Sequence, residues 1–378
     1  MARFPANDII SLVEGTPRYD LAESIGPDLR LADLLDASSP ASLGETPLSY
    51  GTAEGAPRLR KAIADLHGGE PDDVVVTVGG MHALFLIAFI LCDRGDEAVT
   101  TAPLFPLARN ALDVVGANVR TVMLSFDRGY QLDLADLTGQ LSNRTKLVSL
   151  ASPQNPSGVA LPAQTLRHIL AAMEEKCPEA FLLVDETYRE AAYGNDPVAA
   201  NAIDLSPKVI SIASLSKCHG APGLRLGWAI TRDPALREQL VRGKFGTVIS
   251  CSAVDEALAL KLLEARAPII VERRRRLAEG RARTAEWVAQ NHRLVEWVRP
   301  DAGALCCVRL KPAAFDDVAV SRFYDALASE DVRVGNGSWF GEQARVFRLG
   351  FGWLSLPDLD IALQRLTAVL LQATRAAA

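Results

Sequence analysis

Short runs of apolar, often β-branched residues alternate with helical stretches along the first two thirds of the chain. Continuous apolar runs of this length predict strands that are buried on both faces, as in a parallel sheet covered by helices. The ligands of such sheets lie at the carboxyl ends of the strands. The predicted strands are Val74–Val78, Glu97–Thr101, Val119–Leu124, Lys146–Ala151, Phe181–Val184, Lys208–Ile212 and Gly227–Ile230. The predicted helices between them include Met81–Cys92, Ala108–Val115 and Leu161–Lys176.

The pattern changes after about residue 235. The stretch Ala253–Asn291 is long, helical and highly charged, whereas Gly303–Leu310 and Arg345–Leu349 predict strands. These elements indicate a second, α+β domain. The first forty or so residues have weak periodicity and several prolines, and we assign them to that domain as well. The expected division is a large domain at 45–260 and a small domain made of 1–44 and 261–378.

Four consecutive arginines occupy positions 273–276, and Glu272 and Glu279 are close to them in the sequence. Such a run can bind nucleic acid, but on a long helix the mixture of charges favours a solvated face. The net charge of -6 also argues against nucleic acid as the main partner. We therefore expect no nucleic-acid partner.

Composition narrows the class of protein further. The 378 residues are enough for two or three domains, and 49% of them are hydrophobic. No apolar run approaches the roughly 20 residues of a membrane span, and the first residues do not resemble a signal peptide. The six cysteines lack metal-ligand spacing, so we expect reduced thiols and no metal site. Together these features predict a cytoplasmic protein.

Candidate chemistry centres on Lys217, which follows the predicted strand Lys208–Ile212 and therefore lies close to the expected ligand position. A lysine must lose its proton to attack a carbonyl group, so its pKa must fall below about 10.4 through burial or a nearby cation. Ser214 and Arg225 flank it in the sequence. A hydroxyl and a guanidinium beside one lysine suit a phosphate monoester.

Three other strand ends carry polar or glycine residues. Asp185 follows a buried strand, where a carboxylate suits a cationic partner or caps a helix, and Tyr188 on the same loop could bond a phenolic oxygen. Asn155 lies in a proline-rich turn, where it either bonds its own backbone or reaches a ligand. The turn Gly79–Met81 either presents amides to an anion or is an ordinary strand–helix turn.

These segments, in this order, resemble those of the class I/II aminotransferases, which are fold-type I enzymes that use pyridoxal 5′-phosphate. The segment SLSK-x-x-x-x-x-G-x-R-x-G looks like their Schiff-base lysine motif, DETY like their D-x-x-Y, PQNPSG like their N-P-x-G turn, and TVGGMHAL like their phosphate-binding turn. The resemblance implies that Lys217 forms the internal aldimine, that Asp185 pairs with the pyridinium nitrogen, and that Tyr188 bonds the ring O3′. The other cofactor-binding residues that it implies in these segments are Gly79, Gly80, Met81, Asn155, Ser214, Ser216 and Arg225.

Three further segments extend the resemblance along nearly the whole chain. Phe105, in APLF, occupies the place of the family's ring-stacking aromatic residue. Tyr50 and Gly55 resemble a Y-x-x-x-x-G segment whose tyrosine reaches the phosphate of a neighbouring subunit, which implies a homodimer with shared active sites. Arg348, in FRLGF, resembles the residue that binds the substrate α-carboxylate, and Asn155 is expected to contact the substrate as well.

The resemblance implies a mostly parallel seven-stranded sheet in the large domain and a smaller α+β domain. It also implies a transaminase that moves an amino group from an L-amino acid to a 2-oxo acid, with Lys217 as the general base and Asp185 and Tyr188 as its other catalytic residues. Two substrate-pocket segments depart from the family pattern, Ser24–Pro27 and Val334–Gly337. The departures leave aromatic, aliphatic, basic and histidinol-phosphate-like amino donors open.

Other classes of function remain to be weighed. A lyase, a decarboxylase or a cyclising synthase on the same fold would use the same cofactor residues, so the sequence separates them poorly from a transaminase. A regulator that only senses the cofactor is disfavoured, because the motifs begin by Tyr50 and leave no room before them for a DNA-binding domain. A Rossmann dehydrogenase is disfavoured, because no predicted strand is followed by GxGxxG.

Overall fold

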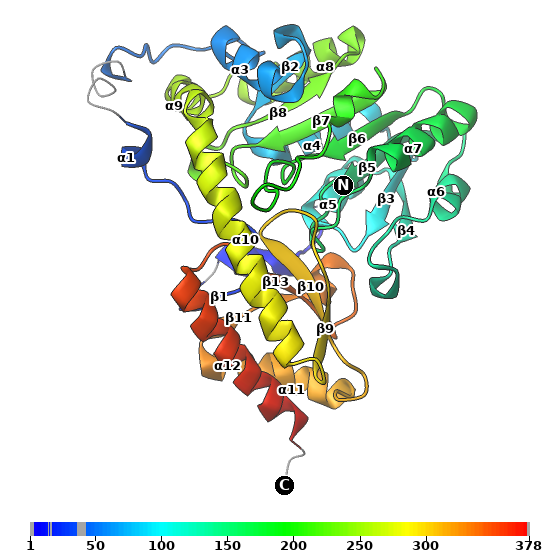
Figure 1. The fold of residues 1–378 in the computed structure, drawn as a ribbon. Helices are drawn as coiled ribbons and strands as arrows, with labels where there is room; N and C mark the ends of the chain where they lie inside the picture. The colour runs from blue at the N-terminus through cyan, green and yellow to red at the C-terminus, as the bar shows by residue number, and fades with distance from the viewer. Residues whose placement is uncertain (1–3, 14, 16, 36–42, 376–378) are drawn as a thin grey trace.

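The computed structural model describes residues 4–13, 15, 17–35 and 43–375, and its largest element is a seven-stranded sheet (Figure 1). Strands β4, β3, β5, β6 and β7 run parallel in that order, and β8 runs antiparallel between β7 and β2. The bounds are β2 Val74–Thr77, β3 Glu97–Ala102, β4 Asn118–Met123, β5 Thr145–Ala151, β6 Phe181–Asp185, β7 Val209–Ser214 and β8 Gly227–Thr231. The predicted α/β fold with a mostly parallel seven-stranded sheet is confirmed.

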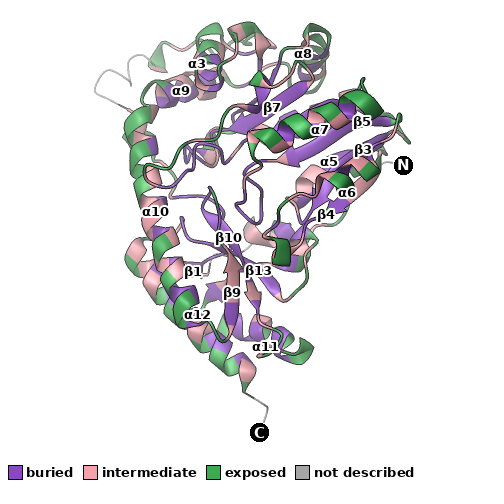
Figure 2. Ribbon diagram, turned by 45° about the vertical axis from the view of Figure 1, so that its right-hand side comes forward, coloured by how far each residue is buried: buried purple, intermediate pink, exposed green. Residues whose placement is uncertain are grey.

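Helices cover both faces of this sheet, which explains why its strands are apolar throughout. Val75 of β2 packs among residues of α4, α5 and α8, whereas Val74 and Val76 face α3 and α9 on the other side. Helices α6 and α7 cover that second face towards β4. Figure 2 shows buried strands between helices whose outer surfaces are exposed. The bounds are α3 Pro57–His67, α4 Gly79–Leu91, α5 Pro106–Val115, α6 Leu134–Gln140, α7 Ala163–Lys176, α8 Pro234–Val248 and α9 Ala253–Glu264.

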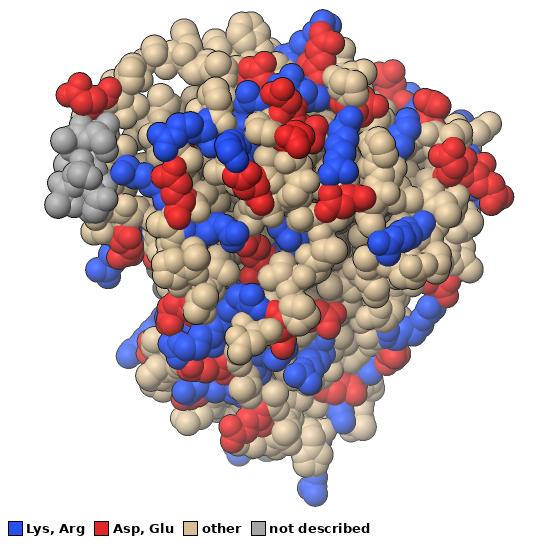
Figure 3. All heavy atoms as spheres, turned by 45° about the horizontal axis from the view of Figure 1, so that its top comes forward, with Lys and Arg blue, Asp and Glu red and all other residues tan. Residues whose placement is uncertain are grey.

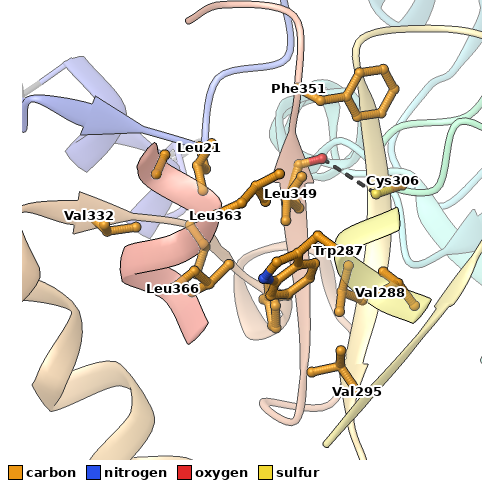
Figure 4. Close-up of a cluster of buried hydrophobic side chains, with 14 of the residues drawn as sticks. Leu21, Trp287, Val288, Val295, Cys306, Val332, Leu349, Phe351, Leu363 and Leu366 are labelled. Carbon is orange, nitrogen blue, oxygen red and sulfur yellow. Dashed lines mark hydrogen bonds between the residues drawn. The ribbon is translucent and has the colours of Figure 1, made fainter. Parts of the chain in front are cut away.

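A second sheet has the order β12-β13-β10-β9 and is antiparallel throughout. Its core contains Trp287, Cys306, Leu349 and Leu366, which point toward one another in Figure 4. Helices α10, α11 and α12 contribute to the same core. The bounds are β9 Val295–Val298, β10 Leu305–Leu310, β12 Gly335–Asn336, β13 Val346–Gly350, α10 Arg266–Gln290, α11 Asp317–Leu327 and α12 Leu356–Thr374.

The N-terminal segment joins this second part of the molecule. Strand β1 (Tyr19–Asp20) pairs in parallel with β11 (Val332–Arg333), and Leu21 belongs to the second core. This pairing agrees with the assignment of the early residues to the small domain. The domain boundaries themselves stay a prediction, and residues 1–3, 14, 16 and 36–42 of that segment lie outside the described residues.

The helical stretch expected at 253–291 is two helices, α9 and α10, that meet at Ala265. On α10 the predicted solvated face fits Arg275, which pairs with Glu272 and Glu279. It does not describe the other three arginines of the run, each of which donates to a backbone carbonyl of a distant segment. A long side chain on an exposed helix can still reach and fix a neighbouring loop. The carbonyl partners are Pro27 for Arg273, Asp196 for Arg274 and Leu354 for Arg276.

Three further features concern the surface charges, the cysteines and the apolar character of the helices. Basic and acidic side chains are interspersed over the face seen in Figure 3, and neither sign forms a continuous patch there. All six cysteines are unpaired and buried. Within the part of the chain that the structure describes, no helix combines the length and the apolar character needed to cross a membrane.

Candidate active site

A pocket of about 850 Å³ lies where the carboxyl ends of β5, β6 and β7 meet the start of α4. The register brings these ends together, because Asp185 at the end of β6 lies between Ala151 of β5 and Ile212 of β7. The predicted site residues that line this pocket are Gly80, Met81, Phe105, Asn155, Asp185, Tyr188, Ser214, Ser216, Lys217 and Arg225. The strand-end location predicted from the sequence is therefore the location of a real pocket.

One end of the pocket is suited to an anion. Helix α4 begins at Gly79 without a side-chain cap, so its first N–H groups remain available. Gly79 has a φ of 72°, and a Cβ placed there would be 2.6 Å from Nη2 of Arg225. The guanidinium therefore packs directly over the glycine turn. Ser214, the last residue of β7, adds a hydroxyl at the same end of the sheet.

Lys217 is held in the pocket by a serine. Its Nζ donates a hydrogen bond to Oγ of Ser24 over 3.2 Å. Burial lowers the pKa of Lys217 to about 8, and the carboxylate of Glu23 opposes this shift while Arg348 adds to it. The sequence analysis required such a fall in pKa for a nucleophilic lysine, and the environment of the side chain supplies it.

Asp185 and Tyr188 face the same pocket from one turn. No helix begins at Asp185, and its Oδ1 accepts a hydrogen bond from Thr187 N over 3.0 Å, so the helix-cap alternative is wrong. Desolvation raises the pKa of Asp185, as expected for a carboxylate at the end of a buried strand. Tyr188 is buried and donates to Ser24 Oγ over 3.0 Å, and burial raises its pKa to about 12.

Asn155 and Arg348 are paired across 193 positions of sequence. Nη1 of Arg348 donates to Oδ1 of Asn155 over 2.9 Å, so the Asn155 side chain reaches another segment and not its own backbone. A second nitrogen, Nη2, donates to the carbonyl of Ala22. Arg348 also lies over the ring of Phe340, 4.6 Å from the ring centroid.

Arg348 is only 2% exposed, yet its Nε has no hydrogen-bond partner. Among the described residues, no carboxylate forms an ion pair with it. Buried guanidinium groups are normally matched by an anion or by a full set of acceptors. Arg348 therefore has binding capacity that the described part of the chain leaves unused.

Three predicted residues, Gly79, Arg348 and Tyr50, do not line this pocket. Gly79 does not line the pocket itself but lies beneath Arg225. Tyr50 is outside this pocket and 80% exposed, beside Gly51, whose N–H donates to Ser250 Oγ over 3.3 Å. The structure therefore does not bring Tyr50 together with Lys217 of the same chain.

Sequence reasoning missed Ser24 as a site residue and placed it only in a segment that departs from the family pattern. Ser24 is 4% exposed and touches both Lys217 and Tyr188. The sequence carries no local signal for this position, because Ser24 reaches Lys217 only where β1 pairs with β11, more than 300 residues further along the chain. A single serine between Glu23 and Ile25 is an ordinary pattern in many folds.

Comparisons with known proteins agree with this geometry. The sequence profile described as aminotransferase class I and II matches residues 7–366. Capreomycidine synthase from Streptomyces vinaceus is 31% identical over 332 residues, which cover 86% of this chain and 83% of the relative. The arginine–pyruvate transaminase AruH from Pseudomonas aeruginosa is 27% identical over 305 residues, which cover 78% of this chain and 75% of the relative.

A solved structure described as the PLP-dependent cyclase OrfR superposes with a TM-score of 0.84 at 26% identity. The superposition covers 97% of this chain and 96% of that protein. The superposition with OrfR spans nearly the whole chain, so that likeness includes both sheets. Their names also differ in the reaction they describe.

Proposed function

Since the chain belongs to the class I and II aminotransferases, which depend on pyridoxal 5′-phosphate, we propose that it is a transaminase acting on an L-amino acid and a 2-oxo acid. The observation that carries the proposal is the joint position of Lys217, Asp185 and the Gly79–Arg225 contact around one pocket. The site residues keep the roles that the resemblance implies, apart from Tyr188, whose single phenolic proton is donated to Ser24.

The residues present fit the cofactor. The open start of α4, with Arg225 packed over Gly79 and with Ser214 and Ser216 nearby, provides donors for a phosphate group. The carboxylate of Asp185 is half-buried at the pocket and has few donors of its own, so it can pair with a protonated pyridine nitrogen. Phe105 offers a ring at the pocket wall, and Tyr188 and Asn155 offer polar groups near the lysine.

The bound cofactor supplies an electron sink that makes the α-proton of an attached amino acid acidic. Lys217, with a pKa lowered to about 8, can hold the proton that leaves the α-carbon and return it to a neighbouring carbon. Arg348 would bind the substrate carboxylate with two parallel hydrogen bonds and so fix the α-carbon beside Lys217. Asn155, which already bonds Arg348, would hold that guanidinium in place.

A basic amino acid is the donor that we propose to test first. AruH is described as an arginine transaminase, and the negative charges of Glu23 and Asp28 both act on Lys217. Neither carboxylate has an ion pair with lysine or arginine among the described residues. Two carboxylates close enough to act on the reacting amine suit a substrate with a guanidinium or ammonium side chain.

We also infer a homodimer, because Tyr50 is exposed and lies outside its own pocket, where it can reach a partner. Mixing Lys217→Ala with Tyr50→Phe subunits tests this. Hybrid dimers with shared sites contain one site that carries both defects and one site that carries neither, so activity should reappear on mixing. Two variants that stay as inactive together as they are apart would refute the shared site.

A cyclising synthase is the second candidate, and the specific observation in its favour is the 31% identity to capreomycidine synthase together with the likeness to the cyclase OrfR. Both reactions need the same cofactor residues. They differ in what happens to the amino group of the donor.

One experiment separates the two candidates. Purified protein loaded with pyridoxal phosphate is mixed with single amino acids, beginning with arginine, in the absence of any oxo acid. A transaminase releases one equivalent of oxo acid per site, shifts the near-visible absorbance of the cofactor and then stops until an oxo acid is added. Continuous turnover that yields ammonia, carbon dioxide or a cyclised product would replace the transaminase proposal. Lys217→Ala is the control that should do neither.

A further inference from the structure

We propose that Ser24 is a positioning residue that orients the Lys217 amine for proton transfer, with Tyr188 fixing the serine hydroxyl in turn. The proposal rests on the proposed function and names one more residue of the same site. It is carried by two contacts of one oxygen atom. Ser24 Oγ accepts from Lys217 Nζ at 3.2 Å and from Tyr188 Oη at 3.0 Å.

The residues just before Ser24 are held in place by hydrogen bonds from β13. The carbonyl of Ala22 accepts a hydrogen bond from Arg348, and the carbonyl of Leu21 accepts one from Gly350 N over 2.7 Å. Gly350 permits this close approach, because a Cβ there would lie 1.8 Å from the carbonyl oxygen of Glu23. The backbone just before Ser24 therefore lies directly against β13.

Ser24 is fixed from the other side as well. Arg273 of α10 donates to the carbonyl of Pro27, and Leu29 N donates to the carbonyl of Gly220 over 2.7 Å. Gly220 lies three residues after Lys217, has a φ of 67°, and would place a Cβ 1.7 Å from a nitrogen of Arg273. The half-buried guanidinium of Arg273 thus bonds the segment that carries Ser24 and packs against the loop that carries Lys217.

Such a fixed hydroxyl has a definite chemical use. Lys217 Nζ would take the α-proton of the substrate with its lone pair, and a bound cofactor would supply the sink for the electron pair left behind. The same proton would then leave Nζ for a different carbon, so the amine must keep its position between the two transfers. Ser24 Oγ accepts from one N–H of the amine and leaves the remaining positions of the nitrogen free to exchange the proton.

Tyr188 makes this contact directional. Because its phenol donates to Ser24, one lone pair of the serine oxygen is occupied and the other remains for Lys217. The hydrogen bond from Lys217 also stabilises its ammonium form more than its neutral form, since a bond to a charged donor is stronger. Loss of the hydroxyl should therefore leave a lysine that is both less well oriented and easier to deprotonate.

Ser24→Ala tests the proposal against Ser24→Thr, which keeps the hydroxyl. In single turnovers with an amino acid and no oxo acid, Ser24→Ala should slow oxo-acid formation about tenfold while amino-acid binding changes less than about twofold. An α-deuterated donor should show a larger isotope effect in this variant. Ser24→Thr should recover most of the rate. The double variant with Tyr188→Phe should lose less than the sum of the two single losses, because the hydroxyls act in series.

A second readout needs no catalysis. The pH at which the cofactor-free full-length protein takes up pyridoxal phosphate, followed by near-visible absorbance, reports deprotonation of Lys217. Ser24→Ala should move this midpoint about one unit lower, and Ser24→Thr should not. Unchanged rates and midpoints in Ser24→Ala, or equal losses in both variants, would overturn the proposal. If no amino acid is transaminated by the wild type, the proposed function fails, whereas the uptake midpoints still decide the role of Ser24.

Discussion

The surroundings of Lys217 have two sides that differ in how the chain builds them. The strand-end side consists of Gly79, Asp185, Lys217 and Arg225, which follow strands of the large sheet. The covering side consists of the segment around Ser24 together with Arg348 and Arg273, which come from the N-terminal segment, β13 and α10. The two sides meet at Lys217, which starts on the first and bonds to the second.

The two sides differ in which of their charged and polar groups have partners within the described part of the chain. On the strand-end side, glycine turns, a helix start and a carboxylate form a set suited to one kind of ligand, a phosphorylated pyridine. On the covering side, Arg348 is buried with one nitrogen unpaired, and Glu23 and Asp28 have no ion pair among the described residues. We therefore propose that the strand-end side holds the cofactor and that the choice of amino acid depends on the covering side. Substitutions on the two sides should separate these two functions.

Arg348→Ala should give the largest separation between the use of the amino acid and the binding of the cofactor. Removal of the guanidinium takes two charge-assisted hydrogen bonds from the substrate carboxylate, so kcat/KM should fall about a hundredfold. The cofactor should stay bound, because Arg348 does not line the pocket next to the phosphate donors. Steady-state kinetics and the near-visible absorbance of the same preparation measure the two quantities together.

Arg348→Lys is the matched variant, since it keeps the charge but not the planar pair of donors. It should recover no more than about tenfold of the loss. Normal turnover by Arg348→Ala would mean that the carboxylate is bound elsewhere. Loss of the cofactor in that variant would show that the two sides of the pocket cannot be separated in this way.

Gly79→Ala should have a smaller effect, which weakens cofactor binding and not amino-acid binding. The added methyl group would lie 2.6 Å from Nη2 of Arg225 at a backbone φ of 72°, so the guanidinium must move away from the helix start. Affinity for pyridoxal phosphate should fall about tenfold, whereas the KM for the amino acid in the loaded enzyme should stay unchanged. Titration of the cofactor-free protein with pyridoxal phosphate gives the affinity.

Gly95→Ala is the control for backbone strain. Gly95 has a φ of 92° but no atom near the position of an added Cβ. It should lose stability by about 1 kcal/mol and keep the affinity for pyridoxal phosphate. An equal loss of affinity in both variants would mean that strain, and not the displacement of Arg225, weakens binding.

The two sides also differ in how well their residues could be predicted from the sequence. The strand-end side could be predicted because each residue follows a strand whose apolar run is visible in the sequence, and parallel strands end at one edge. Lys217, Asp185 and Arg225 were placed in this way and all line one pocket. The link between Asn155 and Arg348 could not be derived from periodicity, since it joins two different sheets.

The covering side depends on contacts that have no local signal. Ser24 reaches Lys217 because β1 pairs with β11, and Arg273 reaches Pro27 from a run of arginines that favours a solvated face by its composition. Long-range pairing and side-chain reach decide these two contacts, and neither is encoded in the spacing of hydrophobic residues. The break between α9 and α10 at Ala265 is different, because Pro268 lies three residues beyond it in the first turn of α10, and a proline at that place is a local signal for the end of one helix and the start of the next.

The smallest predicted effect is a shift in the pKa of Lys217, the residue at which the two sides meet. Burial lowers the pKa of Lys217 to about 8, and the Glu23 carboxylate holds it from falling further. Removal of that negative charge by Glu23→Gln makes the ammonium form less stable, so the pKa should fall and the midpoint for pyridoxal phosphate uptake should move to lower pH. Glu179→Gln, a change at an exposed carboxylate beside Lys208, should leave the midpoint unchanged.

A midpoint near the ordinary lysine value of 10.5 in the wild type would mean that the covering side does not exclude water from Lys217. A midpoint near 8 that does not respond to Glu23→Gln would instead assign the shift to burial alone and remove Glu23 from the electrostatics of the lysine.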